Sequence, residues 1–225
     1  MKTLFSSILL LLSLVGFSQI EEDNLPPSQL ISENWEIIKA GFYFSADLNT
    51  VIGETQSDFY SIDYVQNFNH SIGMQWFVQF SDQLELGIEP GYSNKNFTIT
   101  ETCLECEATR TIQYTLRYFQ LPIYWKYYVS DSKLDVYFTA GTNFAINLFS
   151  NQTIFFNGIT NSLIETNSTR ILVGGRAGAG INYNLNYRYS LGLDLTYTMF
   201  LNRIVSNPDV KSRGLSITPS LLYKF

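Results

Sequence analysis

The sequence contains few of the residues from which metal sites and catalytic centres are built. Its 225 residues include one histidine and two cysteines. A zinc site needs about four ligands, more than one cysteine pair and one distant histidine can supply. A Ser–His–acid triad would have to use that one histidine. We therefore expect no metal, no cofactor and no catalytic residues.

Charged residues are also scarce. They make up 15% of the chain, against about 25% in soluble domains. The net charge is −6, so the chain lacks the excess of basic residues that nucleic acids require, and we expect no nucleic-acid partner. With only six prolines and 45% hydrophobic residues, the chain does not have the composition of a disordered protein. The length fits one large all-β domain.

Long apolar runs are missing as well. The longest, Ile8–Phe17, is well short of the roughly 20 residues that a membrane-spanning helix needs. Lys2 precedes it and small residues end it, which is the layout of a secretory signal peptide rather than an anchor. We expect residues 1–18 to be the signal peptide, with cleavage after Ser18, and the polar residues 19–36 to be a periplasmic leader.

From residue 37 to residue 225 the dominant pattern is an alternation of apolar and polar residues, the signal of a β-strand with two different faces. Each alternating segment has about ten residues or more, the length that a tilted strand needs to cross a bilayer. The eight segments are 38–49, 71–80, 84–93, 119–128, 134–148, 170–183, 189–202 and 215–225.

The connections between these segments alternate between short and long, which is typical of outer-membrane barrels with short periplasmic turns and long outer loops. The long ones are residues 50–69, 100–110 and 150–168. The sequence therefore predicts an all-β fold, an eight-stranded antiparallel up-and-down transmembrane β-barrel. Because eight is an even number, both termini are expected on the periplasmic side of the outer membrane.

A soluble lipocalin-like barrel or β-sandwich would show the same alternation with the apolar face turned inward. Two features favour the membrane barrel. The polar face carries charges that suit a packed lumen: Lys39, Glu85, Glu89, Lys126, Arg176 and Asp194. Aromatic residues gather where two interfacial girdles would lie: Phe80, Trp125, Tyr127, Tyr183, Tyr189, Tyr223 and Phe225 at one rim, and Phe44, Tyr92, Phe97, Phe144 and Phe149 at the other.

The charged lumen could be a gated pore or a salt-bridged plug. Eight strands enclose a space just wide enough for side chains to fill it, so the plug is favoured and the lumen is expected to be occluded.

The fourth segment is irregular. Apolar residues hold even positions from Ile112 to Leu116 and odd positions from Phe119 onward. A β-bulge near Arg117–Tyr118 would exchange the two faces. Alternatively, residues 111–116 stand above the bilayer, where the choice of face matters less.

Residues 118–128 read YFQLPIYWKYY; the export signal ends in GFSQ, and the chain ends in LLYKF. Together these features resemble the PorT-like outer-membrane β-barrel family of Bacteroidota. The matching positions are Tyr118, Leu121, Pro122, Ile123, Trp125, Lys126 and Tyr127, whereas Gln120 stands where the family commonly has an acidic residue. The resemblance implies an eight-stranded barrel in the outer membrane. Some members of the family act in the secretion of other proteins.

The end of the chain also has a specific interpretation. Leu221, Tyr223 and Phe225 alternate to the last residue and resemble the terminal strand that the barrel assembly machinery recognises. A simpler interpretation is that these residues face lipid, and both can hold together.

Two further groups of residues are candidates for chemistry. Cys103 and Cys106 lie in a predicted outer loop, where a local disulfide is favoured over a redox pair because the compartment is oxidising. His70, Ser71 and either Asp82 or Glu85 could in principle form a lipid-modifying site, but they are too dispersed along the strand for general-base chemistry.

The run GGRAGAG at 174–180 lacks the spacing and the following helix of a phosphate-binding loop. We expect its glycines to make room for bulky neighbours such as Tyr124 and Tyr137.

The sequence thus predicts a non-enzymatic outer-membrane protein that acts through its outer loops as a structural or binding protein at the cell surface. These loops carry the aromatic residues Phe59, Tyr60, Phe155 and Phe156. The expected partners are outer-membrane lipid, the barrel assembly machinery and a protein bound by the outer loops. The alternatives are an accessory component of a protein secretion system and, less favoured, a lipid-modifying enzyme.

Overall fold

The computed structural model describes residues 37–53, 59–65, 67–106, 108–129, 133–157, 159–165, 168–205 and 210–225. The predicted signal peptide, 1–18, and leader, 19–36, lie outside the described residues. No helix in the described part of the chain combines the length and the apolar character that crossing a membrane would need.

The described residues form twelve β-strands. Their bounds are β1 (Ile37–Ile52), β2 (Tyr60–Val65), β3 (Asn67–Ser81), β4 (Leu84–Ile88), β5 (Gly91–Asn94), β6 (Phe97–Cys103), β7 (Thr109–Tyr128), β8 (Leu134–Phe156), β9 (Ile159–Glu165), β10 (Ile171–Asn184), β11 (Tyr189–Phe200) and β12 (Lys211–Lys224).

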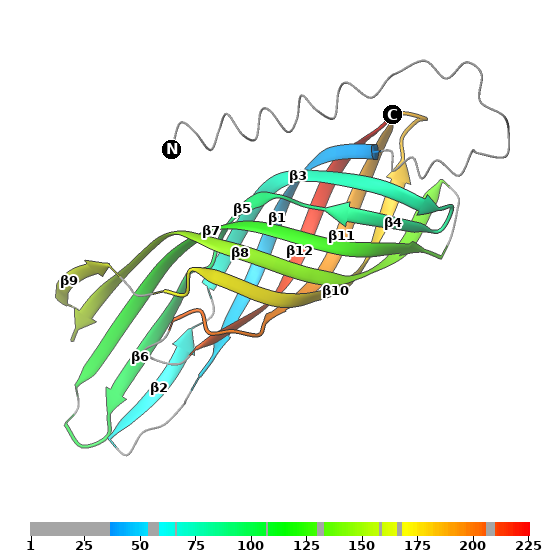
Figure 1. The fold of residues 1–225 in the computed structure, drawn as a ribbon. Coiled ribbons are helices and arrows are strands. Elements are labelled where there is room, and N and C mark those ends of the chain that lie inside the picture. Colours follow the sequence, from blue (N-terminus) through cyan, green and yellow to red (C-terminus); the bar gives the residue numbers. More distant parts are fainter. Residues whose placement is uncertain are drawn as a thin grey trace, which may run out of the picture. The chain divides into compact units, whose positions relative to one another are not determined.

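These strands close into an antiparallel barrel (Figure 1). Neighbouring pairs run β7–β8–β10–β11–β12–β1–β3, and β4 and β5 bridge β3 back to β7. The short strands β4, β5 and β6 follow one another along β7 and together cross the barrel wall once. We call each such crossing a stave, and the described residues form eight staves. The predicted all-β antiparallel barrel is confirmed.

The first and last strands begin and end at the same end of the barrel. Lys39 of β1 pairs with Lys224 of β12. We call this the terminal end. The opposite end is the hairpin end, because β2 and β9 pair there with β6 and β8 and extend the sheet beyond the barrel (Figure 1).

Apolar side chains point out of the barrel and polar side chains point in. On β11, Leu193 is 45% exposed, and its neighbour Asp194 is 3% exposed. The same alternation holds along β12 and along β8 as far as residue 146. The apolar face that period two predicts is therefore the outer surface of the barrel.

A β-bulge occurs at the predicted position along β7, between Arg117 and Tyr118, but its extra residue belongs to the partner strand β8. Arg117 pairs with Phe149 and Tyr118 pairs with Asn147, so the extra residue is Leu148 in β8. Inward and outward positions alternate along β7 without a break from Ile112 to Tyr128. The prediction that the faces of this strand exchange is wrong, because its apolar residues near the hairpin end face inward into an apolar core.

The predicted long loops are largely β-structure. Residues 50–69 contain β2, residues 100–110 contain the paired ends of β6 and β7, and residues 150–168 contain the end of β8 and all of β9. Together β2, β6, β7, β8 and β9 form a sheet that we call the hairpin-end sheet. Backbone pairing satisfies N–H and C=O groups that irregular loops would leave to water, and the alternation of Thr and apolar residues in β6 favours it.

Phe97, predicted at the outer rim, instead lies inside and is 2% exposed. Its ring stacks on that of Tyr114 with the centroids 4.5 Å apart. The reason is parity: odd positions face inward along β4, β5 and β6, and residue 97 continues this series.

Candidate functional site

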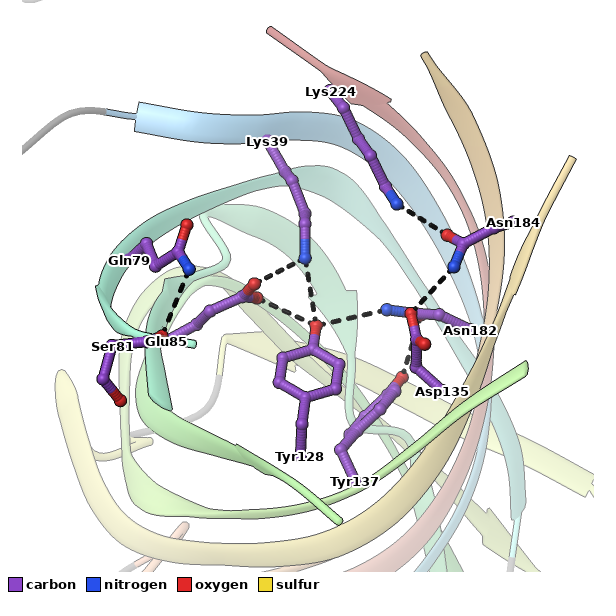
Figure 2. A network of polar contacts seen from close by, with 10 residues as sticks. All are labelled: Lys39, Gln79, Ser81, Glu85, Tyr128, Asp135, Tyr137, Asn182, Asn184 and Lys224. Atoms are coloured by element: carbon purple, nitrogen blue, oxygen red, sulfur yellow. Dashed lines mark hydrogen bonds and ion pairs between the residues drawn. The ribbon is translucent and has the colours of Figure 1, made fainter. Parts of the chain in front are cut away.

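A polar network fills the lumen at the terminal end, where β1, β4, β7, β8 and β10 turn side chains toward one another (Figure 2). The Lys39 ammonium lies 2.5 Å from a Glu85 carboxylate oxygen. The Tyr128 hydroxyl donates to the other oxygen of Glu85 at 2.9 Å and accepts a hydrogen bond from Asn182 at 3.3 Å. Tyr137 donates to the Asn182 carbonyl at 3.4 Å.

The same network reaches the edge of the barrel. Asn184 accepts a hydrogen bond from Lys224 at 2.6 Å and donates to Asp135 at 3.0 Å. Lys224 belongs to β12, Asn184 to β10 and Asp135 to β8. Because these strands follow one another as β12–β11–β10–β8, the contacts link staves along one side of the terminal end (Figure 2). The sequence did not single out Asp135 or Lys224, although both occupy inward positions of their alternating segments.

A buried ion pair occupies the middle of the lumen. Arg176 of β10 pairs with Glu89, which lies between β4 and β5. Glu89 also accepts hydrogen bonds from Gln75 at 2.5 Å and from Tyr124 at 2.6 Å. The Arg176 guanidinium lies 4.5 Å from the centre of the Tyr124 ring. A buried charge needs a partner and hydrogen bonds, and these contacts supply both to the side chains in the middle of the lumen.

Lys126 and Asp194 are buried near this pair but form no ion pair with each other. Lys126 is 1% exposed, and its ammonium lies 3.7 Å from the centre of the Tyr137 ring and 4.6 Å from that of Phe77. Such cation–π contacts favour a desolvated ammonium. One carboxylate oxygen of Asp194 has no hydrogen-bond partner among the described residues. All six charges predicted in the lumen thus lie inside, and four of them form two ion pairs.

A third polar cluster lies toward the hairpin end. The Asp47 carboxylate accepts hydrogen bonds from Ser45 at 2.6 Å and Ser71 at 2.7 Å. Lys95, 6% exposed, places its ammonium 4.7 Å from the centre of the Phe200 ring. Lys95 was not among the lumen charges predicted from the sequence, but it continues the odd inward series of its stave. Asp47 and Lys95 line a cavity of about 30 Å³, room for one or two water molecules.

An apolar plug closes the lumen beyond this cluster. Its side chains come from β1, β6, β7, β8, β10, β11 and the connection between β11 and β12. Leu116, Ile99 and Leu172 are each 0% exposed. The full set is Val51, Phe97, Ile99, Ile112, Tyr114, Leu116, Tyr118, Ala145, Leu172, Phe200, Ile204, Val205 and Val210. A layer of buried apolar side chains opposes the passage of ions, so the polar lumen is closed at the hairpin end.

The charges inside the barrel balance. Among the described residues, the lumen holds five acidic side chains, Asp47, Glu85, Glu89, Asp135 and Asp194, and five basic ones, Lys39, Lys95, Lys126, Arg176 and Lys224. A lumen with equal numbers of both signs presents no ring of one charge that would select ions. Two ion pairs among these charges, Lys39–Glu85 and Arg176–Glu89, link different staves.

Glycines on the strands leave room for the lumen tyrosines. A Cβ atom on Gly180 would lie 2.5 Å from the Tyr137 ring, and one on Gly87 would lie 2.6 Å from the Tyr124 ring. Gly175 differs, with open space where its Cβ would be. Within the GGRAGAG run Gly180 thus makes room for Tyr137, as predicted, whereas the glycines close to Tyr124 are Gly87 and Gly141, outside the run.

A hollow opens on the hairpin-end sheet, on the side that continues the lumen wall. Its volume is about 470 Å³. Arg110 and Glu101, opposite each other on β7 and β6, form an ion pair in its wall at 3.4 Å. Tyr60 and Phe156, each 46% exposed, supply aromatic surface. We call it the hairpin-end hollow; its lining is Tyr60, Ile62, Glu101, Cys103, Cys106, Ala108, Arg110 and Phe156.

The two cysteines belong to the hairpin-end hollow. Their Sγ atoms lie 2.05 Å apart in a disulfide bond that closes the turn between β6 and β7. The hollow therefore has a covalently braced edge, and neither cysteine is a free thiol.

The candidate lipid-modifying site does not assemble, because His70 and Ser71 face opposite sides of the barrel wall. His70 is exposed and lies 3.1 Å from the Asn94 amide, whereas Ser71, the next residue on the strand, faces inward and donates to Asp47. Adjacent strand residues point to opposite faces. Glu85 pairs with Lys39 far from His70, at the terminal end.

The last strand ends in exposed apolar side chains. Leu221 is 47% exposed and Phe225 is 78% exposed. The Tyr223 ring lies between those of Tyr189 and Phe225, with centroid distances of 5.4 Å and 5.3 Å. The three residues of the predicted assembly signal therefore line one edge of the terminal end.

Several solved outer-membrane barrels resemble this fold. Neisserial surface protein A has 11% sequence identity and a TM-score of 0.46, with 83% of this chain and 97% of that chain covered. OprG from Pseudomonas aeruginosa has 13% identity and a TM-score of 0.44, covering 84% and 94%. Ail, the attachment invasion locus protein of Yersinia pestis, has 10% identity and a TM-score of 0.41, covering 84% and 100%.

No curated protein matches the sequence. Residues 19–206 match the model of the family described as outer membrane protein beta-barrel domain. This match covers most of the chain and agrees with the closed barrel and its apolar outer surface. The chain belongs to this family and is an outer-membrane β-barrel protein.

Proposed function

We propose that this protein is a non-enzymatic binding protein of the cell surface, in which a sealed barrel anchors the hairpin-end hollow outside the membrane. The observation that carries the proposal is the contrast between two spaces. The lumen retains a cavity of about 30 Å³, whereas the hairpin-end hollow measures about 470 Å³. The larger volume is within the range of small-molecule sites.

The lining of the hairpin-end hollow suits a ligand or partner segment with both apolar and polar groups. Tyr60 and Phe156 offer exposed rings, and the exposed part of the Glu101–Arg110 pair offers a donor and an acceptor side by side. Aromatic residues and arginine are the residue types that dominate binding surfaces. The disulfide between Cys103 and Cys106 holds the rim of the hollow in place.

The lengths of the connections support a proposed orientation of the barrel. Short turns at residues 82–83 and 185–188 join strands at the terminal end, whereas the hairpin end carries the long extensions. Outer-membrane barrels have short periplasmic turns and long outer loops. We therefore propose that both termini are periplasmic, after a signal peptide at 1–18 and a leader at 19–36.

Site-specific photocrosslinking in intact cells tests the binding role. A photoreactive residue replaces Phe156 in the hollow or, as the control, Tyr187, which is 80% exposed in a turn at the terminal end. We expect one defined adduct from position 156 and none of the same mass from 187. No adduct from position 156, or the same adduct from both, would contradict the proposal.

The identity of the adduct also separates the two functional classes. A PorT-like accessory of a secretion system would yield a subunit of that system in stable ratio with the barrel. A surface receptor or adhesin would yield an external ligand or host component instead. The binding role stands in either case, and only the former result assigns the protein to secretion.

A further inference from the structure

The strand register gathers the lining of the hairpin-end hollow into one continuous patch. Ile62 of β2 lies opposite Glu101 of β6, which lies opposite Arg110 of β7. Arg110 in turn lies opposite Phe156 of β8. Because the side chains of cross-strand partners point to the same face of a sheet, these four side chains form a single row across the hairpin-end sheet (Figure 1).

The neighbours of this row on the same face carry no charge. On the barrel side lie Ile99 and Ile112, which are cross-strand partners and belong to the apolar plug. On the far side lies Cys103 with its disulfide bond. Among the described residues that line the hollow, the charged ones are therefore Glu101 and Arg110.

The ion pair between these two residues leaves hydrogen-bonding capacity unused. The Arg110 guanidinium lies 3.4 Å from a Glu101 carboxylate oxygen, farther than the roughly 2.7–2.9 Å of a strong charge-assisted hydrogen bond. A guanidinium carries several N–H donors and a carboxylate has a second oxygen, and neither side chain has another hydrogen bond among the described residues. The Arg110 side chain is 43% exposed and that of Glu101 is 21% exposed, so water reaches both groups.

An occupant of the hollow would remove this water from both charges. Such burial is costly unless the occupant supplies hydrogen bonds in place of the water. It must therefore bring an acceptor to Arg110 and, directly beside it, a donor to Glu101. A ligand with only a negative charge would lie next to the carboxylate, and a ligand with only a positive charge would lie next to the guanidinium. The site therefore favours a ligand that carries both charges side by side.

The end of the row defines a further part of the ligand. Phe156 lies beside Arg110 and is 46% exposed. Its ring offers a surface on which an aromatic group of a ligand would pack. The volume of the hollow, about 470 Å³, has room for such a group together with the two charges.

We propose that the hairpin-end hollow binds an aromatic α-amino acid in its zwitterionic form. The carboxylate would contact Arg110, the ammonium would contact Glu101, and the aromatic side chain would pack on Phe156. The two charged groups of an α-amino acid are attached to one carbon atom and lie side by side, as the Glu101 and Arg110 groups do. This ligand class rests on the proposed function, in which the hollow is the binding site.

Isothermal titration calorimetry on the full mature chain, folded in detergent micelles, tests this ligand class. The probes are phenylalanine, phenylpropionate without the ammonium, phenylethylamine without the carboxylate, alanine without the ring, and phenylalanylglycine, in which a peptide unit separates the two charges. The variants are Glu101→Gln and Arg110→Gln. The matched controls are Glu105→Gln, exposed in the turn between β6 and β7, and Arg188→Gln, exposed at the terminal end. Faster gel migration before boiling verifies that each variant is folded.

Phenylalanine should bind the wild type about tenfold more tightly than either probe with a single charge, because a hydrogen bond to a charged group contributes roughly a factor of ten or more. Glu101→Gln should weaken the binding of phenylalanine but not that of phenylpropionate. Arg110→Gln should weaken the binding of phenylalanine but not that of phenylethylamine. Both controls should match the wild type, and alanine should bind more weakly than phenylalanine.

Four results would overturn the proposal: no saturable binding of phenylalanine, equal binding of alanine or of a probe with a single charge, tighter binding of phenylalanylglycine, or unchanged binding in both variants. Photocrosslinking from position 156 separates such a result from failure of the proposed function. A defined adduct without binding of phenylalanine would reject the amino acid and retain the binding role, whereas the absence of both would reject both.

Discussion

Replacing Arg176 with methionine should destabilise the barrel strongly, because it leaves the buried Glu89 carboxylate without its counter-ion. Glu89 is 2% exposed and Arg176 is 7% exposed. Removal of one partner from a buried ion pair costs about 3–5 kcal/mol. Gln75 and Tyr124 still donate to Glu89 and should hold the loss near the lower limit of that range.

The assay is urea unfolding of the barrel in lipid vesicles, followed by tryptophan fluorescence. With a slope of about 3 kcal/mol per molar urea, a loss of about 3 kcal/mol lowers the midpoint by about 1 M. The double variant Arg176→Met/Glu89→Gln removes both charges and should recover at least half of the loss. Arg188→Met, in an exposed turn, should stay within about 0.5 kcal/mol of the wild type.

The result that refutes this reasoning is a midpoint for Arg176→Met within 0.3 M of the wild type, a limit of about 1 kcal/mol at that slope. It would mean that water fills the lumen and screens Glu89, and that the barrel is not plugged by its own side chains.

Four further outcomes follow from the packing and from the disulfide. Gly180→Ala should cost about 1–3 kcal/mol because its Cβ would lie 2.5 Å from a tyrosine ring, whereas Gly175→Ala on the same strand, facing open space, should be neutral in urea unfolding. Leu116→Ala, at a fully buried site in the apolar plug, should lower the free energy of unfolding by about 2–5 kcal/mol. Planar-bilayer recordings of the wild type should show no conductance steps, and steady channels would contradict the sealed lumen. Iodoacetamide should label neither Cys103 nor Cys106 until a reductant is added, and labelling beforehand would contradict the disulfide.

The sequence predicted most of the barrel because lipid and lumen impose opposite polarity on alternate residues. The clean alternation at 189–202 corresponds to β11, and its polar member Asp194 lies in the lumen as expected. The even count of segments matched the number of staves because each segment was long enough to cross once. The partners of each lumen charge could not be predicted, since they depend on the tilt and register of staves distant in sequence.

The hairpin end was predicted less well for a physical reason. There the barrel wall extends beyond the part whose outer surface is apolar. Its inner side chains become apolar and its outer side chains become polar, so hydrophobicity no longer identifies the outer face. Phe97 was therefore assigned to the outer rim, and an exchange of faces by a bulge, one of the two alternatives, would have turned Ile112 and Tyr114 outward, whereas all three lie inside. Position parity, continued through each segment without a break, would have placed all three inside and would have included Lys95 in the lumen.

Cysteine accessibility at two neighbouring residues tests the central claim most directly. Leu195 is 50% exposed on the outer surface, and Thr196 is 3% exposed in the lumen. With the barrel in vesicles, Leu195→Cys should react with a lipid-soluble maleimide and not with a water-soluble one, and Thr196→Cys should react with neither until the barrel is unfolded. Reaction of Leu195→Cys with the water-soluble reagent, or of Thr196→Cys with the lipid-soluble one, would contradict a barrel with apolar residues toward lipid and a closed polar interior.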